Sequence, residues 1–186
     1  MSVKQHLMTA EELWEMPDVS GNGFELVDGE VVEGSPANAR HGLIVGKVYK
    51  RLEHHAEQHD LGLVFPYNVG YVLRRNPDLV RAPDVSFLAR NSTPEGDELD
   101  RFVEGPPTLA VEVVSPHDRS EETHRRVRDY LESGTRQVWV LWPKRSAVSV
   151  YSPNADTREL GPESQLDGGY VLPGFSVQVG DLFNIR

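Results

Sequence analysis

The 186-residue chain contains no cysteine, which excludes a disulfide framework and any metal site built from thiolates. It also lacks an apolar run long enough to span a bilayer. Its first residues, MSVKQHLMTA, do not contain the hydrophobic core of a secretion signal. We therefore expect a cytoplasmic protein that makes no contact with a membrane.

Positive charge is also scarce, because 19 Lys and Arg face 29 Asp and Glu and give a formal net charge of −10. This balance argues against binding of nucleic acid through overall positive charge. A local basic groove stays open, because phosphate contacts need only the surface that touches them. Acids are interleaved with Arg119, Arg125, Arg126 and Arg128, a pattern that fits a solvated helix face equally well. The candidates are Arg74, Arg75, Arg81, Arg119, Arg125, Arg126 and Arg128.

Length and composition predict a single soluble domain over residues 1–186. Hydrophobic residues make up 38% of the chain and charged residues 26%, values typical of globular rather than disordered proteins. The run QVWVLW (137–142) and the C-terminal strands offer apolar surface through which a symmetric homodimer could form.

Hydrophobic periodicity and turn signals predict a mixed α/β fold with the order α-β-β-α-β-β-β-α-β-β-β. Asp28-Gly29, between two β-prone runs at 24–33, is a strong hairpin signal. The polar, Pro- and Gly-rich segment 91–107 is expected to be a surface loop. Helices are predicted from Thr9, over 39–58 and over 120–133, and strands over 64–73 (with a break at Pro66), 81–90, 109–114, 137–142, 147–151 and 169–179.

A carboxylate lies inside the apolar strand LAVEVV (109–114). Alternate residues of a strand share a face, so Glu112 points with Ala110 and Val114. A buried and unpaired carboxylate is costly, and Glu112 therefore needs a partner, a proton or a metal ion.

A second acid, Asp84, lies in the predicted strand 81–90, where it shares a face with Ser86. If the two strands are neighbours, Asp84 and Glu112 converge and can bind a hard divalent cation, which prefers oxygen ligands. Pro-Asp by itself is a common turn dipeptide, so the hypothesis depends on the pair.

A basic residue near these acids is expected from the helix 120–133. Val127, Tyr130 and Leu131 define its buried side, and Arg126 lies one turn before Tyr130, at the margin of that side. Arg126 can therefore lean toward the sheet and hold a phosphate. The competing interpretation is an ion pair with Glu122, four residues earlier on the same helix.

Five segments, in this order, resemble the Uma-two family of endonucleases, which belongs to the PD-(D/E)XK nucleases. They are ELVDGEVVEGSP, PDVSFL, EVVSPHDR, RDYLESG and QVWVLWP, and together they cover most of residues 9–152. The resemblance implies a restriction-endonuclease-like core, in which helices flank a central mixed sheet that carries extra antiparallel strands.

The resemblance also implies site residues for a metal-dependent endonuclease that hydrolyses DNA phosphodiester bonds. Asp84 and Glu112 would bind Mg²⁺, with Mn²⁺ as a substitute, and the backbone carbonyl of Val113 would be a further ligand. Such a metal polarises a phosphoryl oxygen and lowers the pKa of a bound water. Arg126 would stabilise the charge that develops on the phosphate, and the inward-facing His41 would position the water or the scissile phosphate.

Two positions depart from the family pattern. Val114 stands at the usual Lys position of the E-x-K motif and can do no acid–base chemistry. In nucleases similar to this family the Lys has moved to the following helix, where this chain has Arg126, which stays protonated and cannot act as a base. Trp142 stands where an acid is common.

Other interpretations of the same residues stay open. The chain could be a nuclease-fold protein that has lost catalysis and serves as a nucleic-acid-binding or interaction module. A glycoside hydrolase using Asp84 and Glu112 is the other enzyme class, although few aromatics accompany the two motifs to stack a sugar. Glu25 is expected to pair with an arginine rather than to bind metal, and His55 and His59, despite their helical spacing, are not assigned to a zinc site.

Overall fold

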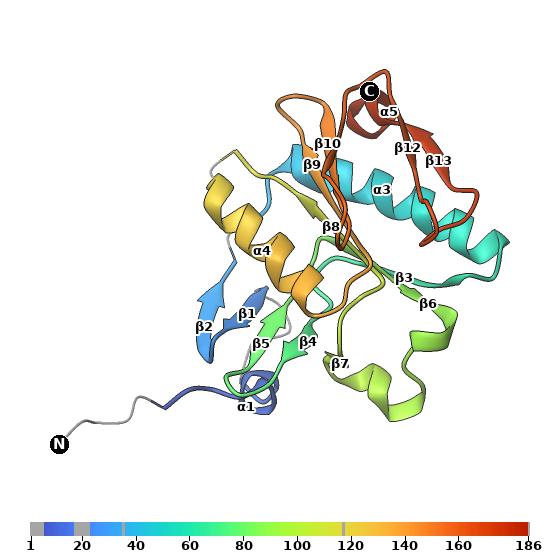
Figure 1. Cartoon of the computed structure of the whole chain (residues 1–186). Coiled ribbons are helices and arrows are strands. Elements are labelled where there is room, and N and C mark those ends of the chain that lie inside the picture. The colour runs from blue at the N-terminus through green and yellow to red at the C-terminus, as the bar shows by residue number, and fades with distance from the viewer. Residues whose placement is uncertain (1–5, 17–22, 35, 117, 186) are drawn as a thin grey trace.

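The computed structural model describes residues 6–16, 23–34, 36–116 and 118–185. Two sheets and a short β-ribbon make up the strand structure of this part of the chain, with helices packed around them (Figure 1). The helices are α1 (Ala10–Trp14), α3 (Ala39–Gln58), α4 (Ser120–Glu132) and α5 (Val179–Phe183), and the 3-10 turns are η1 (Arg90–Ser92) and η2 (Gly96–Asp100).

The central sheet has the order β11-β10-β9-β8-β6-β3. It is mixed, because β8 and β9 are parallel while the other neighbours are antiparallel. Helix α4 connects the two parallel strands. The strands are β3 (Gly62–Pro66), β6 (Val85–Ala89), β8 (Leu109–Val113), β9 (Gln137–Trp142), β10 (Ala147–Tyr151) and β11 (Arg158–Leu160).

The second sheet has the order β2-β1-β5-β4-β7, and β12 pairs with β13 in the ribbon near the C-terminus. The second sheet lies below the central sheet in Figure 1, next to α1. The strands are β1 (Phe24–Val27), β2 (Glu30–Glu33), β4 (Tyr71–Arg74), β5 (Leu79–Arg81), β7 (Val103–Glu104), β12 (Gln165–Asp167) and β13 (Ser176–Gln178).

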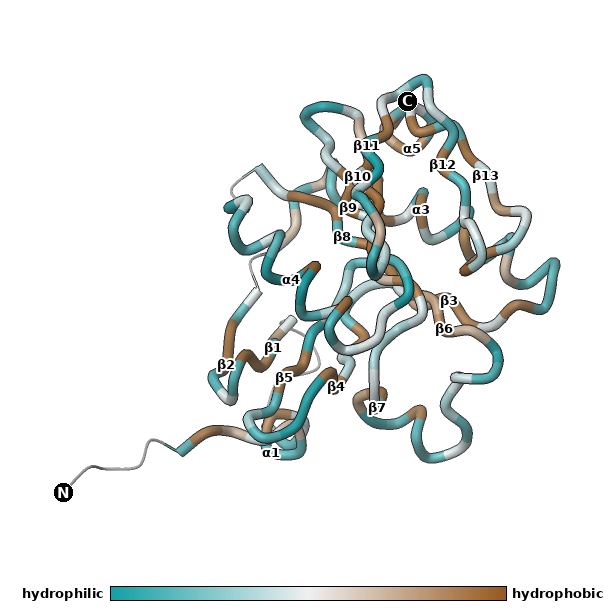
Figure 2. The backbone as a smooth tube through the Cα atoms, in the orientation of Figure 1, coloured by the Kyte–Doolittle hydropathy of each residue, from teal (hydrophilic) through white to brown (hydrophobic). Residues whose placement is uncertain are grey.

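The central sheet has a hydrophobic core on each face. On one face, α3 and the C-terminal segment bury the side chains of Phe87, Val111 and Trp139. On the other face, Val127 and Tyr130 of α4 pack against β8 and β9. Figure 2 shows hydrophobic residues concentrated in these central strands and hydrophilic residues in the surrounding turns.

Local sequence signals explain the helix ends and the hairpin that surround the site. Thr9 and Glu12 form the reciprocal hydrogen bonds of a capping box at α1, as predicted. Asn38 caps α3 by accepting a hydrogen bond from the backbone N–H of His41 at 3.0 Å, which fixes the first turn of that helix. Asp28 and Gly29 both have positive φ, 54° and 80°, as a type I′ hairpin turn requires.

Two predicted strands are each divided between the sheets, which corrects the sequence prediction. Residues 64–73 break where Tyr67 and Asn68 adopt left-handed φ values of 45° and 61°, and the chain passes from β3 to β4. Residues 81–90 break at Ala82–Asp84, between β5 and β6. Pro83 has no N–H to donate to a ladder, so the strand cannot continue through it.

Three further expectations also need correction. The predicted loop 91–107 contains η1, η2 and β7, and β7 pairs with β4. The end of the chain forms the ribbon and α5 rather than one strand over 169–179. Residues 137–142 form an interior strand in which Val138, Trp139, Val140 and Leu141 are at most 1% exposed, so these four side chains offer no surface for a homodimer, which itself stays a prediction.

The remaining outcomes concern the ends of two motifs and the membrane. Ser35 and His117, which belong to the motif segments ELVDGEVVEGSP and EVVSPHDR, lie outside the described residues. Among the helices of the described chain, none has both the length and the apolar character needed to cross a membrane.

Candidate active site

Asp84 lies directly before β6, and Glu112 lies in β8, the antiparallel neighbour of β6, so the two segments are neighbours as the sequence hypothesis required. Val85 at the start of β6 pairs with Val111 of β8, so Asp84, one residue earlier, lies at the level of Glu112. Asp84 is not inside a strand, however. Its Oδ2 accepts a hydrogen bond of 2.7 Å from the backbone N–H of Val113, which anchors its carboxylate at the end of β8.

His41 reaches the same carboxylate from α3. Its Nε2 lies 2.9 Å from Oδ1 of Asp84, and its Nδ1 lies 3.3 Å from Oγ of Ser115. Burial lowers the pKa of His41, but the hydrogen bond and the negative charge of Asp84 outweigh it, so the pKa lies above its usual value. The structure thus places His41 directly beside Asp84, and its predicted role toward a water or a phosphate stays a prediction.

Glu112 is held from the opposite face of the sheet by α4. Oε1 of Glu112 accepts hydrogen bonds of 2.9 Å from Nη2 of Arg126 and of 2.9 Å from the hydroxyl of Tyr130. Burial raises the pKa of the Glu112 carboxyl to about 7; Arg126 opposes that rise, and the charges of Asp84 and Glu25 add to it.

Arg126 leans toward the sheet and binds two acids at once. Its Nη1 lies 2.5 Å from Oε2 of Glu25, and its Nη2 also donates to the carbonyl of Ala82 at 3.2 Å. These two carboxylates outweigh burial and hold the pKa of Arg126 well above its usual value. The competing interpretation, a pair with Glu122, is wrong for the described residues, because Glu122 instead lies 3.4 Å from Arg81.

Glu25 and Arg81 form a buried extension of this network that the sequence indicated only in part. Glu25 accepts from Nη1 of Arg81 at 2.8 Å and from the backbone N–H of Ala82 at 2.8 Å. Arg81 is completely buried and also donates to Asp129 of α4. The predicted pairing of Glu25 with arginine is confirmed. The burial of Arg81 could not be predicted from the sequence, because a single arginine at the end of a strand usually faces solvent.

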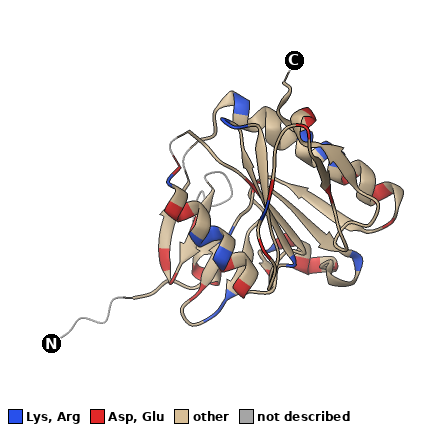
Figure 3. Ribbon diagram, turned by 45° about the horizontal axis from the view of Figure 1, so that its top comes forward, with Lys and Arg blue, Asp and Glu red and all other residues tan. Residues whose placement is uncertain are grey.

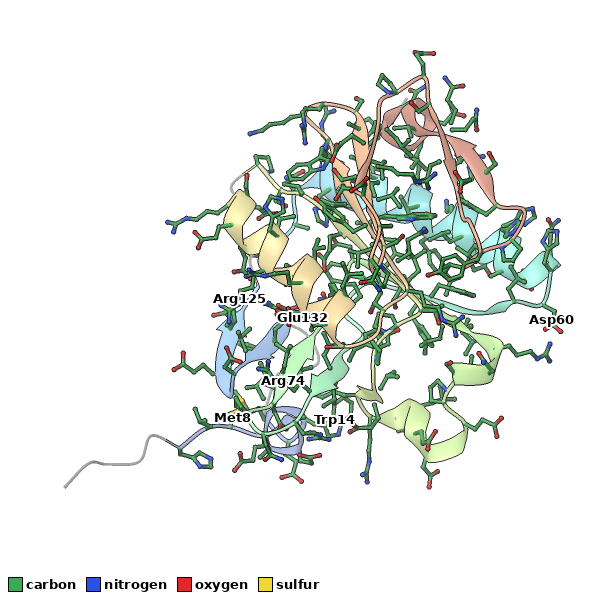
Figure 4. All side chains as sticks on the ribbon, in the orientation of Figure 1. Met8, Trp14, Asp60, Arg74, Arg125 and Glu132 are labelled. Atoms are coloured by element: carbon green, nitrogen blue, oxygen red, sulfur yellow. The ribbon has the colours of Figure 1, made fainter. Side chains whose placement is uncertain are left out.

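Five of the seven arginines singled out for a basic groove pair with acids, namely Arg74, Arg75, Arg81, Arg125 and Arg126. Arg81 is interior, Arg75 pairs with Glu11, Asp78 and Glu104, and Arg74 and Arg125 both pair with Asp28. Figure 4 shows Arg74 and Arg125 on the side of the molecule that carries β2 and β5. In Figure 3 the ribbon of α4 carries acidic and basic positions side by side, as expected for a solvated face.

Asp84 and Glu112 can supply carboxylate oxygens as ligands to a cation. In the part of the chain that the structure describes, no third acidic or histidine side chain completes a metal site with them, because no group of three or more His, Cys, Asp or Glu side chains is placed to hold a metal ion. Oε2 of Glu112 receives no hydrogen bond from the described residues. A metal here would therefore be held by Asp84, Glu112 and backbone or water oxygens.

A pocket of ≈ 710 Å³ opens next to His41, the residue that contacts Asp84; neither Asp84 nor Glu112 is among the residues that line it. His41 and Val114 form part of its wall, and the ends of α3, α4, β9 and β10 complete it. Val114, at the position of the missing Lys, thus gives this pocket an aliphatic wall.

Comparison with known proteins identifies the fold. The model of the Uma2 family, described as "Putative restriction endonuclease", matches residues 10–180. A crystal structure titled as that of "a putative nuclease belonging to DUF820" from Anabaena variabilis ATCC 29413 is similar over 96% of this chain and 98% of that chain, with a TM-score of 0.82 and 17% sequence identity. At that identity the likeness shows the fold, and it confirms the predicted restriction-endonuclease-like architecture. No curated protein matches the chain.

Proposed function

Because this chain belongs to the Uma2 family, whose description is "Putative restriction endonuclease", we propose that it is a Mg²⁺-dependent endonuclease that hydrolyses phosphodiester bonds of DNA. Family and fold indicate a restriction-endonuclease-like nuclease, and the metal and the substrate are proposed from the site. The observation that supports the proposal is the position of Asp84, one residue before β6, at the level of Glu112 on the neighbouring strand β8.

The donor set fits a hard divalent cation. Carboxylate and carbonyl oxygens are the ligands that Mg²⁺ prefers, and Asp84 and Glu112 supply two carboxylates. The N–H and C=O of one strand residue point toward the same neighbouring strand. Since the N–H of Val113 points at Asp84, the Val113 carbonyl is directed to the same side, which supports Val113 as a further ligand. A bound Mg²⁺ would polarise a phosphoryl oxygen and supply a water of lowered pKa.

The surrounding side chains have separate roles in this proposal. Arg126 keeps a permanent positive charge beside Glu112, where it can stabilise negative charge that develops on a phosphate. Tyr130 fixes one oxygen of Glu112 and leaves the other open. His41, whose Nδ1 and Nε2 are held by Ser115 and Asp84, orients the Asp84 carboxylate and faces the pocket through which a phosphate would approach.

The test is cleavage of plasmid, linear duplex and single-stranded DNA in Mg²⁺, Mn²⁺, Ca²⁺ and EDTA. We expect cleavage with Mg²⁺ or Mn²⁺, none in EDTA, and none with Asp84→Asn or Glu112→Gln. Glu121→Gln is the matched control, because Glu121 is exposed on the same helix that carries Arg126. Cleavage that persists in both active-site variants would show that it comes from a contaminant or from another site.

A second candidate function is supported by the bonding of Arg126. Its guanidinium is engaged by Glu25, Glu112 and Ala82, and the Lys position of the motif holds Val114. The chain would then be a nucleic-acid-binding module of nuclease fold with weakened catalysis. Binding of labelled DNA without cleavage under every metal condition above would favour this module over the endonuclease.

A further inference from the structure

The pocket next to His41 has a chemical character that the metal site does not explain. Trp142, at the end of β9, and Tyr151, at the end of β10, form part of its wall. Both aromatic side chains are half-buried, so each keeps part of its surface accessible. The volume of ≈ 710 Å³ lies within the range of about 300–1,000 Å³ that is usual for small-molecule sites.

The indole of Trp142 is fixed in place. Its Nε1 donates a hydrogen bond of 2.7 Å to Oγ of Ser149 on the neighbouring strand. The guanidinium of Arg145, in the turn after β9, lies over the same ring at 4.7 Å from its centroid. An aromatic ring and a guanidinium plane in contact form a platform on which a nucleobase can stack.

The charge around this platform is positive, against the −10 of the whole chain. Arg40, Lys144 and Arg145 line the pocket and are exposed, while the acids in its wall are Asp118 and Glu159. Asp118 accepts a hydrogen bond of 2.6 Å from the backbone N–H of Ser115, which uses part of its acceptor capacity. Cations beside a stacking platform are the combination that binds single-stranded nucleic acid.

We propose that this pocket binds an unpaired nucleotide of the DNA substrate, with its base stacked on the Trp142–Arg145 pair and its phosphate near Arg40 and Lys144. The proposal rests on the proposed nuclease function and adds a substrate class to it, namely single-stranded DNA. A paired base cannot offer its face to the platform, because its neighbours in the duplex cover it. The adjoining His41 and Asp84 would then meet the phosphate of the same or the next nucleotide.

Tryptophan fluorescence tests the contact directly, because the chain contains three tryptophans and only Trp142 lies in this pocket among the described residues. A short oligodeoxythymidylate is titrated into the protein, first in EDTA and again in Ca²⁺. We expect quenching in wild type, no quenching in Trp142→Phe, and retained quenching in Trp14→Phe. Trp14 is the matched control, because it lies on α1 at the far side of the second sheet (Figure 4).

Affinity for a labelled oligonucleotide supplies the second measurement. Trp142→Leu should weaken binding of single-stranded DNA on the order of tenfold or more, in the range of base–aromatic stacking. Arg145→Gln should also weaken it and reduce its salt dependence, and this exposed turn residue can change without loss of the fold. Arg90→Gln is the control, because Arg90 is exposed and pairs with Asp60 outside the pocket.

The outcomes separate this inference from the nuclease proposal. Quenching that is lost in Trp142→Phe, with no cleavage in any metal, supports the nucleotide site and contradicts the nuclease. Metal-dependent cleavage with unchanged oligonucleotide affinity in both Trp142→Leu and Arg145→Gln supports the nuclease and overturns the nucleotide site. Equal or tighter binding of a blunt duplex, relative to the single strand, would also overturn it.

Discussion

Nη2 of Arg126 lies 2.9 Å from Oε1 of Glu112, while Nη1 of the same guanidinium lies 2.5 Å from Oε2 of Glu25. One guanidinium therefore binds two buried acids from different sheets.

Replacing Arg126 with Ala should cost stability and activity together. Removing one partner of a buried ion pair leaves an uncompensated charge, which typically costs about 3–5 kcal/mol. Arg126→Lys keeps the charge and can also pass a proton, so we expect it to recover part of the stability and to keep or raise the cleavage rate. Chemical denaturation and initial cleavage rates measure both effects.

Arg125→Ala is the control for Arg126, because Arg125 is half-exposed on the same helix and pairs with Asp28. Surface ion pairs contribute about 0–1 kcal/mol, so this variant should resemble wild type. A wild-type cleavage rate in Arg126→Ala would remove Arg126 from the site.

Asp84→Ala should abolish metal-induced stabilisation and weaken the metal-free protein. A ligand that binds only the native state raises the melting temperature, so Mn²⁺ or Mg²⁺ should raise it in wild type. Without the carboxylate, the N–H of Val113 loses its acceptor, at a cost of about 1–3 kcal/mol. Melting curves with and without metal measure both. A metal-dependent shift that survives in Asp84→Ala would place the ion elsewhere.

Metal stabilisation should strengthen as the pH rises. A protonated carboxyl binds metal poorly, and the pKa of Glu112 is raised to about 7, so protons compete with the ion below that pH. The metal-induced rise in melting temperature should therefore grow between about pH 6 and pH 8. Glu112→Gln should show little shift at any pH. A shift of equal size on both sides of neutrality would show that Glu112 is not a ligand.

Glu25→Gln should destabilise the protein most near neutral pH. Burial by itself would raise the pKa of Glu25, but the positive charges of Arg126 and Arg81 lower it by a larger amount, so the pKa lies below the usual 4.5. A lowered carboxyl pKa contributes stability that is present above the unfolded value and lost as the pH falls through the folded one. We expect a loss of about 3–5 kcal/mol at pH 7 that shrinks below pH 4.5. Denaturation at several pH values measures this difference, and a constant difference would contradict the ionic role.

Tyr130→Phe removes the hydroxyl that donates to Glu112 and keeps the ring that packs against β8 and β9. The loss of one hydrogen bond should cost about 1 kcal/mol. Because that bond stabilises the charged carboxylate, its loss should raise the pKa of Glu112 further. The pH midpoint of metal-induced stabilisation should then move upward, and Tyr151→Phe, which leaves Glu112 untouched, should not move it.

Several elements were determined by the sequence itself. The helix 39–58 and the strand at 109–113 appear at the predicted positions, and the hairpin turns at Asp28-Gly29. These features depend on neighbours within a few residues, through periodicity, caps and left-handed turn positions, so local chemistry is enough to specify them. The carboxylate inside an apolar strand was visible for the same reason.

Only the tertiary structure decided which segments share a sheet and which charges meet. The break at Ala82–Asp84 sends β5 and β6 into different sheets, although the sequence resembles one strand there. Arg126 forms an ion pair with Glu25, 101 residues away in the sequence, rather than with Glu122, one helical turn away. Periodicity along one segment reports that a side chain is buried, but not against what. The partner is set by the packing of distant strands, where burial makes an unpaired charge too costly to leave alone.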